Sequence, residues 1–231
     1  MAEIQHFRDR AHAGALLARE LAAYAHRPDV IVLALPRGGV PVAFAIAQRL
    51  GVALDILVVR KLGMPHHEEF AMGAVGSGGV RVLQPGVPGL MGVTAQDVET
   101  VATRELAELA RRERSYRGER APLALAGRCA ILVDDGVATG STMLAAIQVA
   151  RRLQPAVLVL AVPVAPPETV RMLAPHVDKL VCLSAPPRFR AVGEWYDSFS
   201  QTDDEEVKHL LATAWDGQPG PDQPKKRRTE P

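Results

Sequence analysis

The sequence predicts an α/β fold with a doubly wound, mostly parallel central sheet and helices on both of its faces. Short runs that are rich in Val, Ile and Leu and free of charge recur along the chain, as expected of strands buried on both faces. Segments with helical spacing of apolar residues lie between them, and this alternation is typical of parallel sheets with crossover helices. The 231 residues, 48% of them hydrophobic, can bury one substantial core, which predicts a single domain over residues 1–215.

Each expected element has a local signal. The first helix has Asp9 as its cap and carries Leu17 and Leu21 four residues apart. The second has Pro41 in its first turn, where proline is tolerated. The expected helices are Asp9–Ala25, Val40–Leu50 and a third that follows the loop of small residues and ends at Leu153. The expected strands are Val30–Leu35, Leu54–Val59, Cys129–Val133, Ala156–Pro163 and Lys179–Leu183.

One long segment interrupts this rhythm. Residues 61–93 are rich in Gly and Pro and contain a hairpin signal, and Thr94 with Asp97 forms a capping-box pattern that begins a charged helix ending near Arg117. An insertion over about residues 61–120 is too long for an ordinary connection, so we expect a mobile or functional loop. Residues 216–231 are rich in Pro, Gly and charge, and we expect them to be disordered.

The composition argues against several classes of protein. A formal net charge of +1 and a pI near 7.9 give no overall field for nucleic acid or an anionic membrane. Cys129 and Cys182 lie in apolar runs and are interpreted as buried strand residues in a reducing compartment, in preference to a disulfide or a ligand pair. No run approaches the ~18 apolar residues of a membrane span, and residues 1–14 lack the apolar segment of a signal peptide. We therefore expect a cytoplasmic protein with no membrane partner.

The stretch AILVDDGVATGST, residues 130–142, carries the most specific chemical signal. Ligands of open α/β sheets bind beyond the carboxyl ends of the strands, which is where this loop begins. Its small and hydroxylated residues let backbone N–H groups approach an anion, and the following helix adds a positive dipole end. The pattern is neither a Walker loop nor a Rossmann fingerprint. Because carboxylates accept hydrogen bonds from sugar hydroxyls, a phosphate beside Asp134 and Asp135 predicts a ribose 5-phosphate group in the ligand.

This stretch resembles the phosphoribosyl-pyrophosphate (PRPP) signature of the type I phosphoribosyltransferases. LPRGGVP at 35–41 is similar to the family's pyrophosphate loop, RKLGMPHHEEF at 60–70 occupies the place of its flexible catalytic loop, and VGEWYDSFSQTDDEEV at 192–207 looks like the hood that covers the base. The combination of PRGG, RKLG and EWYxxF is most similar to a bacterial subgroup known only as predicted phosphoribosyltransferases. Gly136 departs from the family pattern, which usually has an aliphatic residue or serine there, and a looser turn is expected.

The resemblance implies a role for each matching position. The hood would span about residues 186–215, and Mg²⁺ would bridge the ribose diol and the pyrophosphate with no direct protein ligand assigned. The family often carries a non-proline cis peptide in the pyrophosphate loop. The 5-phosphate would be bound by Ala138, Thr139, Gly140, Ser141 and Thr142, the ribose hydroxyls by Asp134 and Asp135, the pyrophosphate by Arg37, Gly38 and Gly39 with charge added by Arg60 and Lys61 of the flexible loop, and the base by Trp195, Tyr196 and Phe199.

Simpler interpretations stay open for several of these residues. Arg37 also suits a structural contact with a carboxylate, Arg60 and Lys61 suit an exposed strand end, and the three aromatic residues suit a terminal segment that fills the core. His66 and His67 with Glu68 and Glu69 have poor ligand geometry and are interpreted as a solvated loop, with loop closure as the alternative. The arginines of the charged segment are interpreted as a solvated face, with phosphate binding as the alternative: Arg111, Arg112, Arg114, Arg117 and Arg120. The basic run Lys225–Arg228 is interpreted as a solubilising charge.

Three functions fit these motifs. The leading hypothesis is a Mg²⁺-dependent transfer of 5-phosphoribose from PRPP to a nitrogenous base, either purine or pyrimidine. The alternatives are a regulatory protein that senses PRPP or nucleotides, and a hydrolase or phosphorylase of a phosphorylated ribose compound. A pyrophosphate loop together with a flexible loop favours the transferase. The sequence does not indicate which base is the acceptor or what the oligomeric state is, although homodimers are common in the family that it resembles. Nucleic acid is not expected as a partner.

Overall fold

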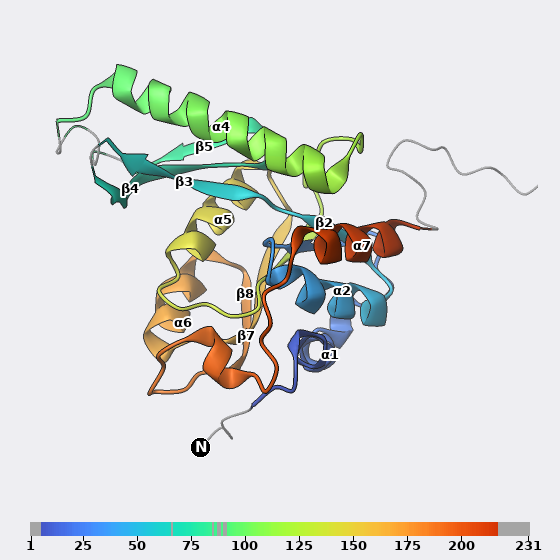
Figure 1. Ribbon diagram of the computed structural model, residues 1–231. Coiled ribbons are helices and arrows are strands. Elements are labelled where there is room, and N and C mark those ends of the chain that lie inside the picture. The colour runs from blue at the N-terminus through green and yellow to red at the C-terminus, as the bar shows by residue number, and fades with distance from the viewer. Residues whose placement is uncertain (1–5, 66, 85, 87–88, 90–91, 217–231) are drawn as a thin grey trace, which may run out of the picture.

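The centre of the protein is a five-stranded parallel sheet with the strand order β2–β1–β6–β7–β8 (Figure 1). The computed structural model describes residues 6–65, 67–84, 86, 89 and 92–216. The predicted doubly wound α/β sheet is confirmed. Its strands are β1 Val30–Ala34, β2 Ala53–Ile56, β6 Cys129–Val133, β7 Val157–Val164 and β8 Lys179–Ser184.

Helices cover both faces of this sheet, and the strands alternate their side chains between them. In β1, Val30, Val32 and Ala34 pack into the same apolar cluster as α1 and α2, whereas Ile31 and Leu33 pack with α5. This explains why the strand is apolar at every position. The helices on the first face are α1 Arg10–Glu20, α2 Gly39–Leu50 and α7 Asp204–Trp215, and those on the second are α5 Ser141–Arg152 and α6 Pro167–Leu173.

The first helix is shorter than expected. The side chain of Asp9 caps it by accepting a hydrogen bond from the backbone N–H of His12 at 2.7 Å, as the sequence indicates. The α-helix ends at Glu20, and a 3-10 turn over Ala22–Tyr24 follows within the segment predicted to be helical. Pro41 lies in the first turn of α2, as expected.

The insertion forms a second, three-stranded antiparallel sheet in the order β3–β4–β5 where the sequence predicted a hairpin. The predicted strand Leu54–Val59 is divided, because pairing with β1 stops once the backbone N–H of Leu57 has bonded to the carbonyl of Ala34. The helix α4 covers one face of the second sheet and α5 lies against the other (Figure 1). The elements are β3 Val59–Met64, β4 His67–Gly76, β5 Val80–Leu83 and α4 Ala95–Arg117.

Two details of the insertion follow directly. The predicted capping box is confirmed, since Thr94 and Asp97 exchange hydrogen bonds at the start of α4. His67, which was expected in a loop, begins strand β4. His66 and the side chains of Glu68 and Glu69 lie outside the described residues.

The segment after β8 divides into two parts that pack in different places. A 3-10 turn, η4 Val192–Trp195, precedes Tyr196, which pairs with Phe7 near the other end of the chain. Helix α7 packs instead against α2 and β2, where the indole N–H of Trp215 donates to the carbonyl of Leu54 at 2.9 Å. The predicted hood over residues 186–215 is therefore two units. The predicted tail beyond Asp216, with Lys225–Arg228, lies outside the described residues.

Both cysteines are free, as expected from their apolar surroundings. Cys129 is buried in β6, and Cys182 in β8 is partly buried and donates to the carbonyl of Ser184 at 3.1 Å. Within the part of the chain that the structure describes, no helix is both long and apolar enough to cross a lipid bilayer.

Candidate functional site

Two loops leave the central sheet side by side where the strand order reverses. Strands β1 and β6 are neighbours with Ala34 opposite Val133, while β2 lies beyond β1 and β7 lies beyond β6. The backbone N–H of Leu35 donates to the carbonyl of Val133 at 2.9 Å, which keeps the two chain exits together. Ligands of doubly wound sheets bind at such a switch point. The structure thus brings the PRGG loop and the DDGVATGST loop to one place.

The loop before α5 presents donors suited to an anion. Gly140 has φ near 80°, a conformation that favours glycine, and among the described residues no side chain caps the N-terminus of α5. The exposed hydroxyl oxygens of Thr139 and Ser141 lie 3.3 Å apart. Thr169 of α6 fixes the loop from behind by donating to the carbonyl of Ala138 at 2.6 Å. Backbone N–H groups and hydroxyls therefore converge on the space in front of the helix.

The departure at Gly136 has a structural explanation. A Cβ atom at this position would lie 2.5 Å from Cγ1 of Val192, so a side chain of the C-terminal segment fills the space. The backbone N–H of the buried residue Val137 donates to the carbonyl of Val164 at 2.9 Å, which ties the turn to β7. Glycine at position 136 therefore allows the loop to pack closely against Val192.

Asp135 is held by residues from both ends of the chain. Its Oδ2 accepts a hydrogen bond from Nε of Arg10 in α1 at 2.8 Å, and its carbonyl accepts one from the hydroxyl of Tyr196 at 2.5 Å. Only 14% of the Asp135 side chain is exposed. Arg10 was not singled out from the sequence, because it lies 125 residues away from its partner and belongs to no local motif.

Asp134 is the acid that stays available. Its Oδ1 accepts the backbone N–H of Asp135 at 2.9 Å, and no side chain within the described part of the chain hydrogen bonds to it. Burial raises the pKa of both carboxyl groups, and the charge of Asp135 raises the pKa of Asp134 further. The guanidinium of Arg10 opposes the rise in pKa at both sites. Two adjacent carboxylates are thus balanced by one arginine.

The PRGG loop packs directly against the two acids. A Cβ atom at Gly38 would collide with the carboxylate of Asp135, and one at Gly39 would lie 2.7 Å from the carbonyl of Val133. The glycines are therefore required by close approach. The peptide bond between Pro36 and Arg37 is cis, the feature that the resemblance indicated for this loop.

The side chain of Arg37 lies beside a cavity of 260 Å³. Its Nη1 is 3.7 Å from Oδ1 of Asp204 at the start of α7, and that oxygen accepts the hydroxyl of Tyr116 in α4 at 2.7 Å. Burial and the bond to Asp204 raise the pKa of Tyr116 to about 12. Arg111 and Arg112 of α4 also line the cavity, as does Thr142 in the first turn of α5. The structure therefore joins Arg37 to residues interpreted from the sequence as a solvated face.

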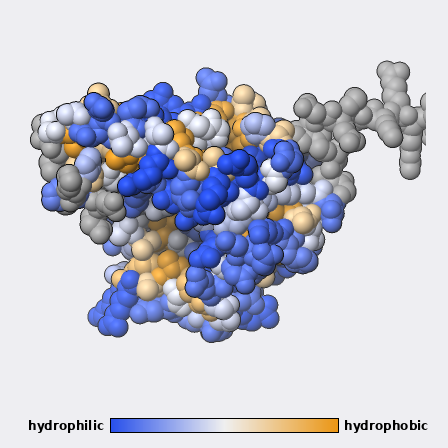
Figure 2. All heavy atoms as spheres, turned by 45° about the horizontal axis from the view of Figure 1, so that its top comes forward, coloured by the Kyte–Doolittle hydropathy of each residue, from blue (hydrophilic) through white to orange (hydrophobic). Residues whose placement is uncertain are grey.

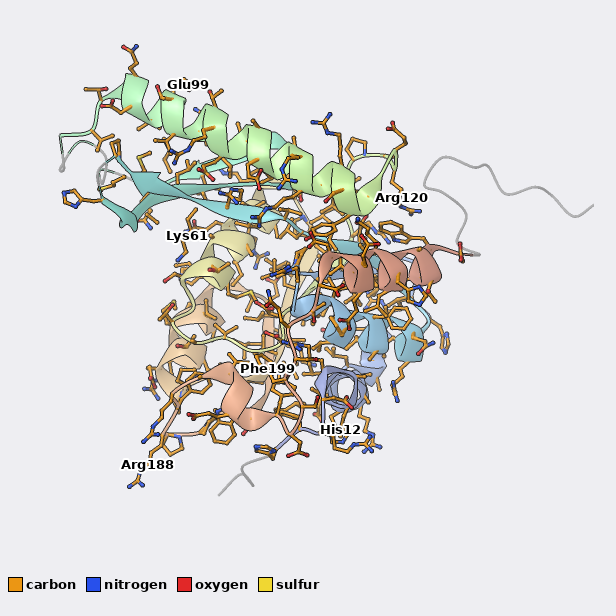
Figure 3. The ribbon with its side chains drawn as sticks, in the orientation of Figure 1. His12, Lys61, Glu99, Arg120, Arg188 and Phe199 are labelled. Atoms are coloured by element: carbon orange, nitrogen blue, oxygen red, sulfur yellow. The ribbon has the colours of Figure 1, made fainter. Side chains whose placement is uncertain are left out.

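Arg60 and Lys61 point to opposite faces of β3. Nε of Arg60 pairs with Oε2 of Glu105 in α4 at 2.5 Å, a contact that neither interpretation of Arg60 from the sequence included. Lys61 lines a separate cavity of 270 Å³ together with Thr139 and Ser141. Figure 3 shows Lys61 between the second sheet and α5. The two cations are thus not brought together at the PRGG loop.

Two of the three aromatic residues pack on each other, since the ring centroids of Tyr196 and Phe199 lie 5.0 Å apart at an interplanar angle of 30°, whereas Trp195 packs elsewhere. Tyr196 is 5% exposed and packs on Phe7 with ring centroids 5.4 Å apart. Trp195 stacks on Phe189 with centroids 6.5 Å apart, and Phe199 is 36% exposed with the guanidinium of Arg10 3.9 Å above its ring. Figure 3 shows Phe199 at the junction of the C-terminal segment and α1. Phe199 is therefore the most exposed member of the trio, and it lies against Arg10, the partner of Asp135.

Mg²⁺ fits the chemistry of these donors. The described residues include no group of three or more His, Cys, Asp or Glu side chains that could hold a metal ion by themselves. Mg²⁺ commonly keeps several waters and takes one or two carboxylates together with substrate phosphates. With Asp135 paired to Arg10, Asp134 is the carboxylate that would face such an ion.

Cavity size alone does not identify this site. A cavity of 630 Å³ lies at the opposite, amino end of β1, lined by Val30, His26, Arg27 and Phe44 among others. The chemistry of the switch point favours the smaller cavities as the candidate site.

Comparison with known proteins agrees with this geometry. The family of the phosphoribosyl transferase domain matches residues 2–194. Proteins from two strains of Mycobacterium tuberculosis, each named "Putative phosphoribosyl transferase", are 47% identical over 208 residues, which is 90% of this chain and 47% of each relative. The chain thus spans about half the length of these curated relatives. The crystal structure of a protein from Thermus thermophilus is 46% identical with a TM-score of 0.81, covering 90% of this chain and 99% of that one. The chain belongs to the phosphoribosyl transferase domain family.

Proposed function

We propose that this chain transfers 5-phosphoribose from PRPP to a nitrogenous base and releases pyrophosphate in a Mg²⁺-dependent reaction. The meeting of three features at the switch point carries the proposal: the donors before α5, the carboxylate of Asp134, and the PRGG loop against Asp135. PRPP carries a phosphate, a diol and a diphosphate around one ribose ring. Family membership supports a site for such a sugar phosphate.

Each part of PRPP has a matching group. Ala138–Thr142 would bind the 5-phosphate through backbone N–H groups and hydroxyls. Asp134 would accept hydrogen bonds from the ribose hydroxyls, while Asp135 would be held in place by Arg10. Arg37 and the backbone of Gly38 and Gly39 would bind the pyrophosphate, since a guanidinium offers a forked set of donors.

The chain's own residues would act mainly by positioning and by charge. Breaking the C1–O bond makes an oxocarbenium-like carbon and a pyrophosphate leaving group, and a base nitrogen then attacks C1 from the opposite face. Arg37 would stabilise the leaving group, and the buried surroundings of the two acids would exclude water. When bound, Mg²⁺ supplies further positive charge to the ribose diol and the diphosphate. The exposed ring of Phe199 is the proposed contact for a planar base.

Lys61 belongs to the 5-phosphate end in this proposal. It shares a cavity with Thr139 and Ser141, so its charge would support the phosphate bound there. Arg60 is engaged with Glu105 and would act indirectly, by holding α4 against β3.

Calorimetric titration of PRPP with Mg²⁺ tests the proposal. We expect micromolar binding to the wild type and loss of binding in Asp134→Asn, because the neutral amide weakens the hydrogen bonds to the ribose diol. Asp29→Asn is the matched control, since Asp29 is an exposed acid paired with Arg27 at the amino end of β1. No PRPP binding by the folded wild type would contradict the proposal. Pyrophosphate release with a panel of bases then follows, and binding without release would favour the PRPP sensor.

A further inference from the structure

The cavity beside Arg37 is a distinct compartment between the PRGG loop and α4. It has a volume of 260 Å³ and opens next to the loop proposed for the 5-phosphate. Its apolar part comes from the residues that follow β1 and β2, which are Leu35, Pro36, Leu57, Val58 and Val59. Its polar lining consists of Arg37, Arg111, Arg112, Ser115, Tyr116, Thr142 and Asp204.

The charges of this lining favour an anion. Three arginines and one aspartate face the cavity, and Thr142 adds a neutral hydroxyl donor. The hydroxyl of Ser115 already donates to the carbonyl of Arg112 at 2.8 Å, and that of Tyr116 to Asp204. In the space-filling view (Figure 2), strongly hydrophilic residues gather near the middle of the face that includes α4, with apolar residues among them. Forked guanidinium groups match phosphate oxygens in geometry as well as in charge.

Arg111 and Arg112 are oriented by one shared carboxylate. Glu108 accepts Nε and Nη2 of Arg111 at 2.7 and 2.9 Å, and it accepts Nε of Arg112 at 2.8 Å. These two arginines lower the pKa of Glu108 to about 2. One negative charge between two guanidinium groups leaves a positive excess, with Nη donors beyond those used by Glu108.

Asp204 leaves Arg37 available to a ligand. The 3.7 Å separation of Arg37 Nη1 and Asp204 Oδ1 is longer than a hydrogen bond, and that oxygen already accepts from Tyr116. To bind Arg37, an anion would therefore have to displace only its ion pair with Asp204, which has no direct hydrogen bond.

The position of α4 is set by contacts on its other faces. Arg117 is buried and pairs with Asp55 of β2 at 3.0 Å, and Arg60 of β3 pairs with Glu105. Just after the end of α4, the guanidinium of Arg120 lies 4.2 Å from the ring centroid of Trp215 in α7. Arg114 bonds within α4 itself, to the carbonyl of Ala110, so this contact joins the helix to no other element. Of the five arginines marked in the sequence, Arg111 and Arg112 are the two that line this cavity.

The size and place of the cavity indicate which part of a ligand it takes. Pockets for whole ligands typically measure ~300–1,000 Å³, so 260 Å³ suits one end of a larger molecule. Thr142 belongs both to the cavity and to the loop proposed for the 5-phosphate, so the two anion-binding regions are continuous. A ligand with phosphate at one end and diphosphate at the other spans them.

We propose that Arg111 and Arg112 of α4 bind the diphosphate of the substrate together with Arg37. The identity of this ligand rests on the proposed function, whereas the anion site itself rests on the cavity and its arginines. The insertion would then contribute to the site through its helix, and Arg60 and Arg117 would be positioning residues for that helix.

Calorimetry with three probes separates these statements: inorganic pyrophosphate with Mg²⁺, PRPP with Mg²⁺, and ribose 5-phosphate. In the double variant Arg111→Gln/Arg112→Gln, we expect binding of pyrophosphate and PRPP to weaken roughly tenfold or more. Ribose 5-phosphate lacks the diphosphate, so its binding should change less than about twofold. The control Arg104→Gln/Arg114→Gln removes the same charge from the same helix. A second variant, Arg111→Lys/Arg112→Lys, keeps the charge without the fork and should lie between the wild type and the glutamine variant.

Each outcome decides a different statement. Selective loss of pyrophosphate and PRPP binding supports the inference. Unchanged binding in the glutamine variant, or equal loss with all three probes or in the control, overturns it and leaves the proposed function standing. Pyrophosphate binding that depends on Arg111 and Arg112 without any PRPP binding supports the anion site and contradicts the proposed function. Failure of the folded wild type to bind either pyrophosphate or PRPP overturns both.

Discussion

The central sheet and the inserted sheet with its helix α4 are held together in different ways. Every residue of β1 and β6 is apolar and at most 4% exposed, so these strands are stabilised by burial between two layers of helices. Helix α4 buries few apolar residues and is joined to its neighbours by the ion pairs Arg117–Asp55, Arg60–Glu105 and Arg81–Glu99. The loops on the central sheet thus rest on an apolar frame, whereas α4 depends on charge for its position.

The largest effect is expected from Arg117→Ala. Burial raises the pKa of Asp55 and Arg117 opposes that rise, so removing Arg117 leaves a buried carboxylate without its partner. Breaking a buried pair in this way lowers the free energy of unfolding by about 3–5 kcal/mol. The loss should shrink as the pH falls and Asp55 is protonated. Denaturant unfolding at several pH values checks this, with Arg114→Ala, at an exposed position, as the control. A decrease in the free energy of unfolding of less than about 1 kcal/mol would contradict the view that ion pairs hold α4 in place.

In the central sheet, Ile131→Ala should be nearly as severe but insensitive to pH and salt. Ile131 is fully buried in β6, and truncation leaves a cavity that lowers the free energy of unfolding by about 2–5 kcal/mol. Ile131→Val is the graded control, at about 0.5–1.5 kcal/mol. Unfolding at low and at high salt concentration is the measurement. A salt-dependent loss would break the contrast between the two regions.

Asp134→Asn is expected to stabilise the fold near neutral pH. Because burial raises the pKa of Asp134 in the folded protein, its ionisation destabilises that state as the pH rises through the raised value. The amide removes this penalty and keeps the acceptor for the N–H of Asp135, so we expect a gain of about 0.5–2 kcal/mol at neutral pH. The gain should vanish in acid, where the wild type is protonated too. Thermal unfolding across pH tests the sign, and a loss of stability at neutral pH would contradict it.

The smallest effect is expected from Arg60→Gln. Glu105 would keep its contact with Arg104 at 3.1 Å, so the loss should be about 1 kcal/mol. Hydrogen exchange should show faster opening of α4 with unchanged protection in β1 and β6. Equal loss of protection in both regions would mean that the two sheets open as one unit.

The sequence predicted the regions whose signals are local. The apolar strands, the capping box and the two loops at the switch point each depend on neighbouring residues, and the structure places these elements as expected. The division between β2 and β3 has no such signal, because Leu57 and Val58 continue the apolar run without a turn residue. Recognising β3 as a strand would have separated Arg60 from Lys61, since successive side chains of a strand point to opposite faces.

Contacts between distant segments were beyond reach for a related reason. The bond from Arg10 to Asp135 and the cavity shared by Arg37 and α4 arise only when the whole chain is folded. The sequence showed five arginines in the charged segment but not which of them faces the PRGG loop. Which arginines face the loop depends on the orientation of α4, and the ion pairs of Arg117 and Arg60 set that orientation.

Asp135 is bound by residues from both ends of the chain, so its contacts can form only in a fixed order during synthesis. Chains emerge from the ribosome with their N-terminal part first, so α1, the PRGG loop and the two acids are made well before Tyr196. The hydroxyl that accompanies Arg10 at Asp135 therefore arrives after the parallel strands β1, β2, β6, β7 and β8 are all available. If the proposed ligand needs both contacts at Asp135, its binding site is completed only late in synthesis, and the ligand would stabilise the finished protein and not its precursors.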